Sequence, residues 1–470
     1  MPMTFIFCIL REIFTKMILR FVVKNLFSFK EETEFNLFPN RTTNLLHHKT
    51  LLNDIAVLRF SAIYGANGSG KSNLVKAISL LDQIIENGKL PTNPRHLKFK
   101  LSEENELEPV SLAIELFAGV SIYYYSITFD GQNILHEYLA KSKSTEDELI
   151  FEREIIEGKQ EIKFYPEYLL NEKNKLFAEV LAEKLVPLNE VLISFLSTKY
   201  EKEFPDIARV VNWFRYDLIV ISPDAKPGEI ADILDIDQDM KTFANEFLPS
   251  LNTGVSNIEV VRENFFEKVN IETPEMHETL AQLIERMKDL PDGVIPMPHL
   301  SRDELSFVKE GEKLVIKKLV TNHKTITGKN VPFNVSLESD GTRRLIDYIP
   351  AFQDIIHQER VYIIDEIERS IHPLTIKEII RKISHDPQAK GQMIFTTHES
   401  NLLDQDILRT DEIWFAQKDL GGASKLYSLS DYKVHSTINI ENGYLNGRYG
   451  GIPFLSNLRD LNWNKDEISE

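Results

Sequence analysis

The pattern of apolar and polar residues divides the chain into segments of two kinds. Extended patterns fill residues 17–64 and 110–140, and the run at residues 19–29 has a hairpin partner at residues 34–38. Residues 165–300 carry apolar residues at mostly helical spacing, broken by prolines and glycines, and keep no heptad register over three turns. The pattern predicts a mixed α/β protein with a mostly helical insertion and without a long coiled-coil arm.

Four parts of the chain follow from these patterns. Residues 17–164 and 301–470 carry the strands of a mixed sheet and an antiparallel β subdomain, and residues 165–300 form an inserted lobe. Residues 1–16 contain the apolar run Phe5–Leu10, which is too short to span a membrane and lacks the cleavage site of a signal peptide. We interpret residues 1–16 as an extension that a mis-assigned start would explain.

Three consecutive tyrosines, Tyr123–Tyr125, lie in the second alternating segment. They could form a platform on which nucleic-acid bases stack. The alternation and the Asp130-Gly131 turn favour a half-buried strand of a hairpin, because aromatic side chains pack well on a pleated surface.

A glycine-rich loop at residues 65–72 lies between an apolar run and a helical pattern at residues 72–87. It reads G-x-x-x-x-G-K-S, which is a phosphate-binding loop in the strand–loop–helix context that this motif needs. Glycines let backbone N–H groups turn toward phosphate oxygens, and the helix N-terminus adds partial positive charge. Lys71 is expected to reach the β- and γ-phosphates of ATP, and the Ser72 hydroxyl to bind Mg²⁺. The expected nucleotide-binding residues of this loop are Gly65, Asn67, Gly68, Ser69, Gly70, Lys71, Ser72 and Asn73.

Two later strand patterns end in residues that complete such a site. The strand at residues 361–366 ends in Asp365, which can hold magnesium through water, and Glu366, which can polarise the attacking water. The next buried strand ends in His398, where an imidazole can hydrogen-bond a γ-phosphate. A lone histidine is more often structural, but its place at a strand end favours a role in the site. The sequence therefore predicts Lys71, Glu366 and His398 as catalytic residues and Ser72 and Asp365 as metal ligands.

A serine-glycine turn precedes the Asp-Glu strand. Ser339, Gly341 and Thr342 open a helical pattern, and such a helix N-terminus can accept the γ-phosphate of an opposing copy of the chain. This turn is common in isolation, and its order before the Asp-Glu strand is what favours a role in nucleotide binding.

Composition limits the class of protein. The chain has 470 residues, 42% hydrophobic and 27% charged, which is typical of a soluble protein with more than one core. Its net charge of −18 argues against a surface that coats nucleic acid indiscriminately. The single cysteine, Cys8, excludes an intrachain disulfide and any cysteine-based zinc cluster, and a reducing cytoplasm is the expected location.

These motifs together resemble the ABC-type ATPases of the RecF, SMC and OLD-like branch, and most closely the bacterial "AAA family ATPases" linked to abortive-infection and restriction loci. The loop at 65–72, the Ser339 turn, the strand at 361–366 and His398 stand in the order of that family. Residues 24–29 look like its opening strand, and residues 443–453 look like its C-terminal hallmark. The signature has Asp340 where transporters carry glycine, and no glutamine of a Q-loop can be placed, although residues 97–101 occupy the corresponding position.

The resemblance implies a P-loop ATPase that hydrolyses ATP with Mg²⁺ and works as a homodimer or higher even oligomer, with two ATP molecules between the copies. OLD proteins carry a C-terminal TOPRIM nuclease, and the residues after His398 are too few for one, so an effector nuclease or toxin is expected to be a separate partner. The expected role is an ATP-driven switch in anti-phage defence, without a membrane partner. A RecF-like DNA-binding protein of repair or chromosome maintenance is the alternative, and a transporter ATPase is the least favoured.

A basic stretch at residues 313–330 motivates the DNA alternative. It holds Lys313, Lys317, Lys318, Lys324 and Lys329 and no acidic residue. We consider it a candidate DNA-contact ribbon, with a solvated hairpin that ends at Gly328 as the more favoured interpretation.

Overall fold

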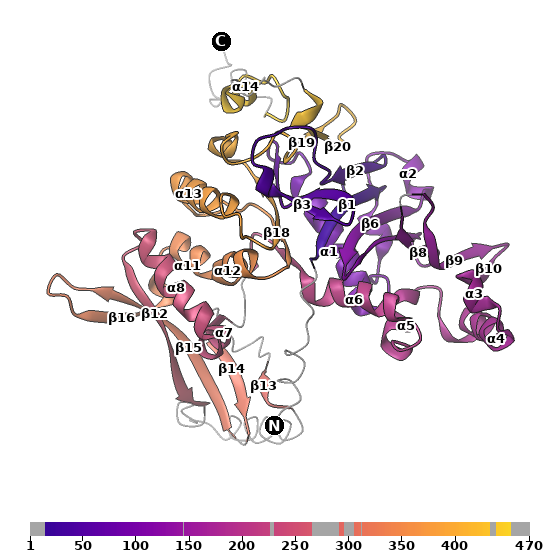
Figure 1. The fold of residues 1–470 in the computed structure, drawn as a ribbon, viewed down its shortest axis with the longest axis horizontal. Helices are drawn as coiled ribbons and strands as arrows, with labels where there is room; N and C mark the ends of the chain where they lie inside the picture. Colours follow the sequence, from indigo (N-terminus) through magenta and orange to yellow (C-terminus); the bar gives the residue numbers. More distant parts are fainter. Residues whose placement is uncertain are drawn as a thin grey trace, which may run out of the picture. The chain divides into compact units, whose positions relative to one another are not determined.

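The computed structural model describes residues 15–143, 145–225, 230–265, 291–295, 305–311, 313–432 and 439–452. The chain forms two compact units. Unit 1 contains residues 1–222, 359–367 and 384–470, and unit 2 contains residues 223–358 and 368–383. Figure 1 shows both, and each is described by itself.

A six-stranded sheet forms the centre of unit 1. Its order is β11 (Leu218–Ile221), β17 (Val361–Ile364), β18 (Gln392–Thr397), β5 (Phe60–Tyr64), β19 (Ile413–Lys418) and β20 (Ser424–Ser428). The first five strands are parallel, and β20 pairs antiparallel to β19. The register aligns Tyr64 with Thr397 and Ile364 with Phe395, so the residues that follow β5, β17 and β18 emerge at the same edge of the sheet.

A seven-stranded antiparallel sheet is the second layer of unit 1. Its order is β10 (Lys159–Phe164), β9 (Glu148–Ile156), β8 (Ile134–Ser142), β7 (Ser121–Phe129), β6 (Val110–Ala118), β1 (Met17–Lys24) and β2 (Thr33–Asn36). The expected pairing of residues 19–29 with residues 34–38 is confirmed for β1 and β2. The tyrosine segment is a half-buried strand, since Tyr123 and Tyr125 are fully buried in β7 and Tyr124 is partly exposed.

Helices cover these sheets. In unit 1 they are α1 (Lys71–Asn87), α2 (Glu104–Leu107), α3 (Pro166–Leu169), α4 (Glu172–Val180), α5 (Leu192–Lys199), α6 (Pro205–Asp217) and α14 (Ile440–Leu445), and a hairpin of β3 (Lys49–Leu52) and β4 (Ile55–Leu58) precedes β5. Helix α1 packs against α5 and α6. Its buried face joins the core that both sheets share. No helix in the described ranges is long and apolar enough to cross a bilayer.

Unit 2 combines a sheet with helices. The sheet order is β12 (Val255–Asn264), β15 (Lys313–Lys324), β14 (Leu305–Glu310) and β13 (Gly293–Val294), and β16 (Asn330–Asn334) also pairs with β15. The helices are α7 (Ile230–Ile236), α8 (Gln238–Ser250), α11 (Asp340–Asp347), α12 (Ile349–His357) and α13 (Pro373–Ser384). Helices α7 and α8 pack on β12, and Phe247 of α8 contacts Phe352 of α12.

The boundaries between the two units differ from the boundaries expected at residues 165 and 300. Residues 165–222 lie in unit 1, where α6 buries Val210, Val211, Trp213 and Phe214 in the core and β11 extends the central sheet. Unit 2 holds a five-stranded sheet as well as helices, and its last helices come from residues beyond 300. Short apolar runs such as residues 218–221 do not distinguish a strand from a helix by periodicity, which is why the pattern alone gave a mostly helical lobe.

A buried histidine–carboxyl pair joins the segment before β3 to the segment before β19 in unit 1. His48 and Glu412 are fully buried, and His48 Nδ1 lies 2.8 Å from Glu412 Oε1. His48 Nε2 lies 2.9 Å from the Ser384 carbonyl oxygen, which can only accept, so this nitrogen carries a proton. Burial lowers the pKa of His48 to about 4, and burial raises the pKa of Glu412 well above its usual range. Neutral His48 therefore accepts a hydrogen bond from a protonated Glu412, and the pair holds one dissociable proton.

Stability should depend on pH in a way that this shared proton fixes. The unfolded pair holds no dissociable proton above about pH 6.5, one between about 4.3 and 6.5, and two below. Folding thus takes up a proton above about pH 6.5, and the free energy of unfolding should fall by up to about 1.4 kcal/mol per pH unit from there to the raised pKa of Glu412 in the folded protein. Glu412→Gln, whose amide can donate to His48 Nδ1, should remove this contribution when urea unfolding is measured from pH 6 to 8.5. Equal slopes for the two proteins would show instead that the pair carries no extra proton.

Candidate functional site

The phosphate-binding loop follows β5 and leads directly into α1. Gly70 has φ of 112°, and a Cβ on it would lie 2.1 Å from Ser424 Oγ, so only glycine fits there. Lys71 is the first residue of α1 and is only 4% exposed. Its Nζ donates to the Gly65 carbonyl oxygen at 2.7 Å and the Ala66 carbonyl oxygen at 3.3 Å. The predicted loop thus forms a turn with its ammonium group inside.

A chain of hydroxyl groups supports the back of this loop. Asn73 Nδ2 donates to Ser28 Oγ at 2.8 Å, and Ser28 Oγ lies 2.7 Å from Ser424 Oγ. Ser424 Oγ donates in turn to the Ser69 carbonyl oxygen at 2.7 Å. Ser28 and Ser424 were not predicted as parts of the site, and Asn73, predicted to bind the nucleotide, directs its side-chain amide to Ser28. Ser28 lies in the opening segment that the family resemblance singled out, but no signal in the sequence marks Ser424.

The ends of the three central parallel strands bring the other predicted residues together. Asp365 follows β17 and is only 2% exposed. Ser72 Oγ donates to Asp365 Oδ1 at 3.1 Å, and Thr396 Oγ1 of β18 donates to the same oxygen at 2.5 Å. A hydroxyl and a carboxylate oxygen side by side match what Mg²⁺ takes from proteins, which is one or two such ligands completed by water and phosphate. The donor set therefore fits the predicted magnesium ligands.

The side chains of His398 and Lys71 lie close together, because β18 and β5, which lead to these residues, are adjacent strands. His398 follows β18 and is exposed, and its Nε2 lies 3.2 Å from Lys71 Nζ. An imidazole next to the loop's ammonium group is in reach of whatever anion that ammonium binds. The structure thus brings Lys71 and Ser72 together with Asp365 and His398, which come much later in the chain.

Glu366 adopts a backbone conformation that is rare for residues other than glycine. Its φ is 51°, and its N–H donates to Thr396 Oγ1 at 2.8 Å. Such a left-handed residue costs about 1–3 kcal/mol, and conformations of this kind cluster at functional sites. The Thr396 hydroxyl thereby holds both residues of the Asp-Glu pair, Asp365 through its carboxylate and Glu366 through its backbone N–H.

The serine-glycine turn lies in unit 2. Ser339 caps α11, and its Oγ accepts the Thr342 N–H at 3.1 Å. A Cβ on Gly341 would lie 2.6 Å from the Ser370 carbonyl oxygen, so the turn packs closely on the segment that follows the Asp-Glu pair. Ser339 is exposed, whereas Thr342 is 7% exposed and its hydroxyl lies 2.9 Å from Ser339 Oγ. Ser339 and the helix N-terminus are therefore presented to solvent, and Thr342 supports them from behind.

The basic stretch differs from its prediction at one position. Lys317 of β15 is 1% exposed and pairs with Asp232 at 2.6 Å and Asp235 at 2.7 Å. Burial opposes its charge, but the hydrogen bonds that Lys317 donates to both aspartates raise its pKa. The prediction of Lys317 as a DNA contact was therefore wrong, because two aspartates of α7, outside the basic stretch, already pair with its charge. Lys313, Lys324 and Lys329 are exposed, and Lys318 is partly exposed.

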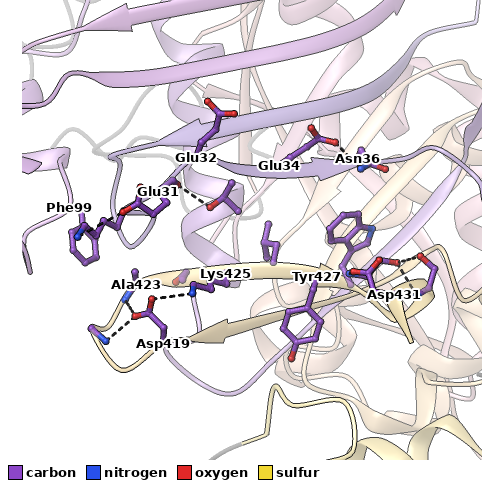
Figure 2. Close-up of a pocket in the computed structure, with 18 of the residues that line it drawn as sticks. Glu31, Glu32, Glu34, Asn36, Phe99, Asp419, Ala423, Lys425, Tyr427 and Asp431 are labelled. Carbon is purple, nitrogen blue, oxygen red and sulfur yellow. Dashed lines mark hydrogen bonds and ion pairs between the residues drawn. The ribbon is translucent and has the colours of Figure 1, made fainter. Parts of the chain in front are cut away.

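A groove of about 810 Å³ lies between β2 and β20 in unit 1 (Figure 2). Its lining includes the carboxylates of Glu31, Glu32, Glu34, Asp411, Asp419 and Asp431, against the ammonium groups of Lys30 and Lys425. This excess of carboxylates would repel phosphate groups, so the groove does not suit a nucleotide's triphosphate. Among the described residues, no group of three or more His, Cys, Asp or Glu side chains could hold a metal ion.

The chain is similar to one described protein family and to several solved structures. The sequence profile of a family described as "AAA domain, putative AbiEii toxin, Type IV TA system" matches residues 60–404. Similar solved structures include an SMC head bound to the C-terminal winged-helix domain of ScpA (14% identity, TM-score 0.42, 87% of this chain and 97% of that chain). The SMC head domain of Thermotoga maritima (12%, 0.37, 87% and 98%) and an SMC head with the C-terminal domain of ScpA from Pyrococcus furiosus (13%, 0.42, 92% and 99%) also match.

A search of curated proteins finds no match. The family match spans the phosphate-binding loop, the serine-glycine turn, the Asp-Glu strand and His398, and the mixed α/β core carries the loop between a central parallel strand and its helix. The chain has a mixed α/β fold and belongs to the family described as "AAA domain, putative AbiEii toxin, Type IV TA system".

Proposed function

We propose that the protein hydrolyses ATP at the edge where β5, β17 and β18 end. The observation that carries this proposal is the 3.1 Å contact between Ser72 Oγ and Asp365 Oδ1, since it joins the phosphate-binding loop to the Asp-Glu strand. The same edge holds an ammonium group, a strained glutamate and a histidine. These groups suffice to bind a triphosphate, orient a water molecule and neutralise developing charge, which is most of what phosphoryl transfer needs.

Each residue has a role in this reaction. The N–H groups of residues 65–72 and the Lys71 ammonium bind the β- and γ-phosphates of ATP. Glu366 orients a water molecule and accepts its proton as the water oxygen attacks the γ-phosphorus and ADP leaves. His398 donates a hydrogen bond to a γ-phosphate oxygen. Ser72 and Asp365 would hold Mg²⁺, which supplies positive charge to the β- and γ-phosphate oxygens.

The Ser339 turn acts on a second copy of the chain. Its exposed serine and helix N-terminus suit an anion, and the proposed anion is the γ-phosphate bound by the loop of the partner. ATP thereby holds two copies together, and hydrolysis removes the charge that bridges them. Because the dimer exists only with ATP bound, the protein is a switch between two assembly states.

The proposed biological role is a switch in anti-phage defence that works with a separate effector protein, a nuclease or toxin. The description of the family, which refers to a toxin of a toxin–antitoxin system, supports this role. A RecF-like role in DNA repair is the second candidate, and the exposed Lys313, Lys324 and Lys329 support it. A nuclease or toxin gene beside this one would favour the first.

Glu366→Gln should trap the ATP-bound dimer. The amide keeps the size of the side chain but cannot accept a proton, so ATP stays intact between the copies. Light scattering with ATP and Mg²⁺ should give twice the monomer mass for the variant, and ATP turnover should fall at least about 100-fold. Glu368→Gln, two residues along the chain, is the matched control and should retain turnover. A Glu366→Gln protein that binds ATP and stays monomeric would refute the dimer.

A further inference from the structure

A hollow of about 1260 Å³ lies beside the phosphate-binding loop in unit 1. One wall is the loop itself, residues 65–69, with His398 next to it. Its lining also comes from β19 and the β19–β20 turn, through Gln417, Lys418, Asp419 and Leu420, and from the C-terminal segment, through Tyr444, Leu445 and Ile452. The hollow thus combines the backbone of the loop with three polar side chains and the apolar side chains of the turn and the C-terminal segment.

The C-terminal segment is packed firmly in this position. The ring of Phe415 in β19 stacks on Tyr444 with centroids 5.5 Å apart and on Tyr449 with centroids 6.0 Å apart. The Tyr444 hydroxyl donates to the Gly451 carbonyl oxygen at 3.2 Å, and a Cβ on Gly451 would lie 3.7 Å from Gly65 Cα. The segment that the sequence marked as a family hallmark is therefore built against the loop. Yet it leaves Leu445 58% exposed, and Leu420 in the β19–β20 turn is fully exposed.

An exposed leucine also lies beside the serine-glycine turn in unit 2. Val335–Leu337 is a short 3₁₀ helix in which Val335 is buried and Leu337 is 70% exposed. Leu337 stands two residues before Ser339, so their Cα atoms are at most about 7 Å apart. Any partner that binds Ser339 must therefore have a surface that accommodates Leu337 close to the Ser339 contact.

We infer that the hollow is the docking site for Leu337 of a second copy of this chain. The inference rests on the proposed ATP-bound dimer, in which Ser339 of one copy meets the phosphate held by residues 65–72 of the other. Because that loop forms the inner wall of the hollow, Leu337 of the partner arrives at an apolar surface made by Leu420, Leu445 and Ile452. The contact removes exposed leucines from water on both copies, and it makes the C-terminal segment part of the dimer interface.

The test uses the full chain with Glu366→Gln, ATP and Mg²⁺, and measures the dimer dissociation constant by sedimentation. Leu337→Asp and Leu445→Asp, each added to this parent, should weaken the dimer at least about tenfold, because each places a carboxylate in an apolar contact. Leu170→Asp, at an 82% exposed leucine elsewhere in unit 1, is the matched control and should not change the constant.

Introducing opposite charges at positions 337 and 445 tests whether these two side chains contact each other across the dimer. Leu337→Asp combined with Leu445→Lys in one chain should recover most of the lost affinity, since the introduced carboxylate of each copy would meet the introduced ammonium group of the other. Binding of a fluorescent ATP analogue to the monomer should be equal in all variants, because the loop is unchanged. If the Glu366→Gln parent dimerises and the added Leu337→Asp change leaves its dissociation constant unchanged, this inference is wrong. The proposal of the ATP-bound dimer would not be affected by that result. A parent that binds the analogue but never dimerises would refute the dimer proposal itself.

Discussion

Lys71→Ala should reduce ATP turnover at least about 100-fold, because the ammonium group is the strongest fixed positive charge in the loop. It is held inside the turn by the Gly65 and Ala66 carbonyl oxygens and lies beside His398. Alanine removes the charge that would meet the β- and γ-phosphates, and no other lysine or arginine belongs to the loop. Turnover is measured as phosphate release at saturating ATP, together with binding of a fluorescent ATP analogue, which should weaken as well.

Two further variants make this result specific. Lys71→Met keeps the aliphatic stem, so a comparable loss with methionine would assign the effect to the charge. Lys76→Ala changes an exposed lysine on the same helix and should leave turnover unchanged. Normal hydrolysis by Lys71→Ala, with its melting temperature preserved, would exclude the loop as the site.

The site was predictable from the sequence because its chemistry lies in short contiguous motifs. The glycine spacing at residues 65–72 fixes a loop conformation, and an apolar strand that ends in Asp365-Glu366 fixes where two carboxylates emerge. Parallel strands then bring both to one edge, which the contact between Ser72 and Asp365 shows. Neither step depends on residues outside the motifs.

The features that escaped prediction depend on partners that are distant in the sequence. The charge of Lys317 is neutralised by Asp232 and Asp235, and a count of lysines along a stretch cannot reveal that. Ser424 supports the loop across 355 positions of the chain. Strand β11 joins the central sheet by pairing with β17, which comes far later in the chain.

A buried charge network joins the antiparallel sheet of unit 1 to the helices that follow it. Glu137 of β8 is fully buried, and its carboxylate accepts the N–H groups of Leu192 and Ile193 at 2.9 and 3.0 Å. It thereby caps α5, whose own N-cap residue provides no side-chain hydrogen bond. Arg153 of β9 is 1% exposed and lies 3.4 Å from the same carboxylate. Helix α5 in turn contacts α1 through Ser194 Oγ, which donates to the Ile85 carbonyl oxygen.

Glu137→Ala should lower the free energy of unfolding by about 3–5 kcal/mol, because it leaves the Arg153 charge buried without its carboxylate and two helix N–H groups without an acceptor. The measurement is urea unfolding followed by tryptophan fluorescence, which reports on the buried Trp213 of unit 1. Glu154→Ala removes the exposed ion pair with Lys163 on neighbouring strands and should change stability by less than about 1 kcal/mol. Glu137→Leu combined with Arg153→Met should be less destabilising than Glu137→Leu alone, because the Arg153 charge is then no longer buried without its carboxylate. If Glu137→Ala were as stable as Glu154→Ala, the network would not be what holds α5 on the sheet.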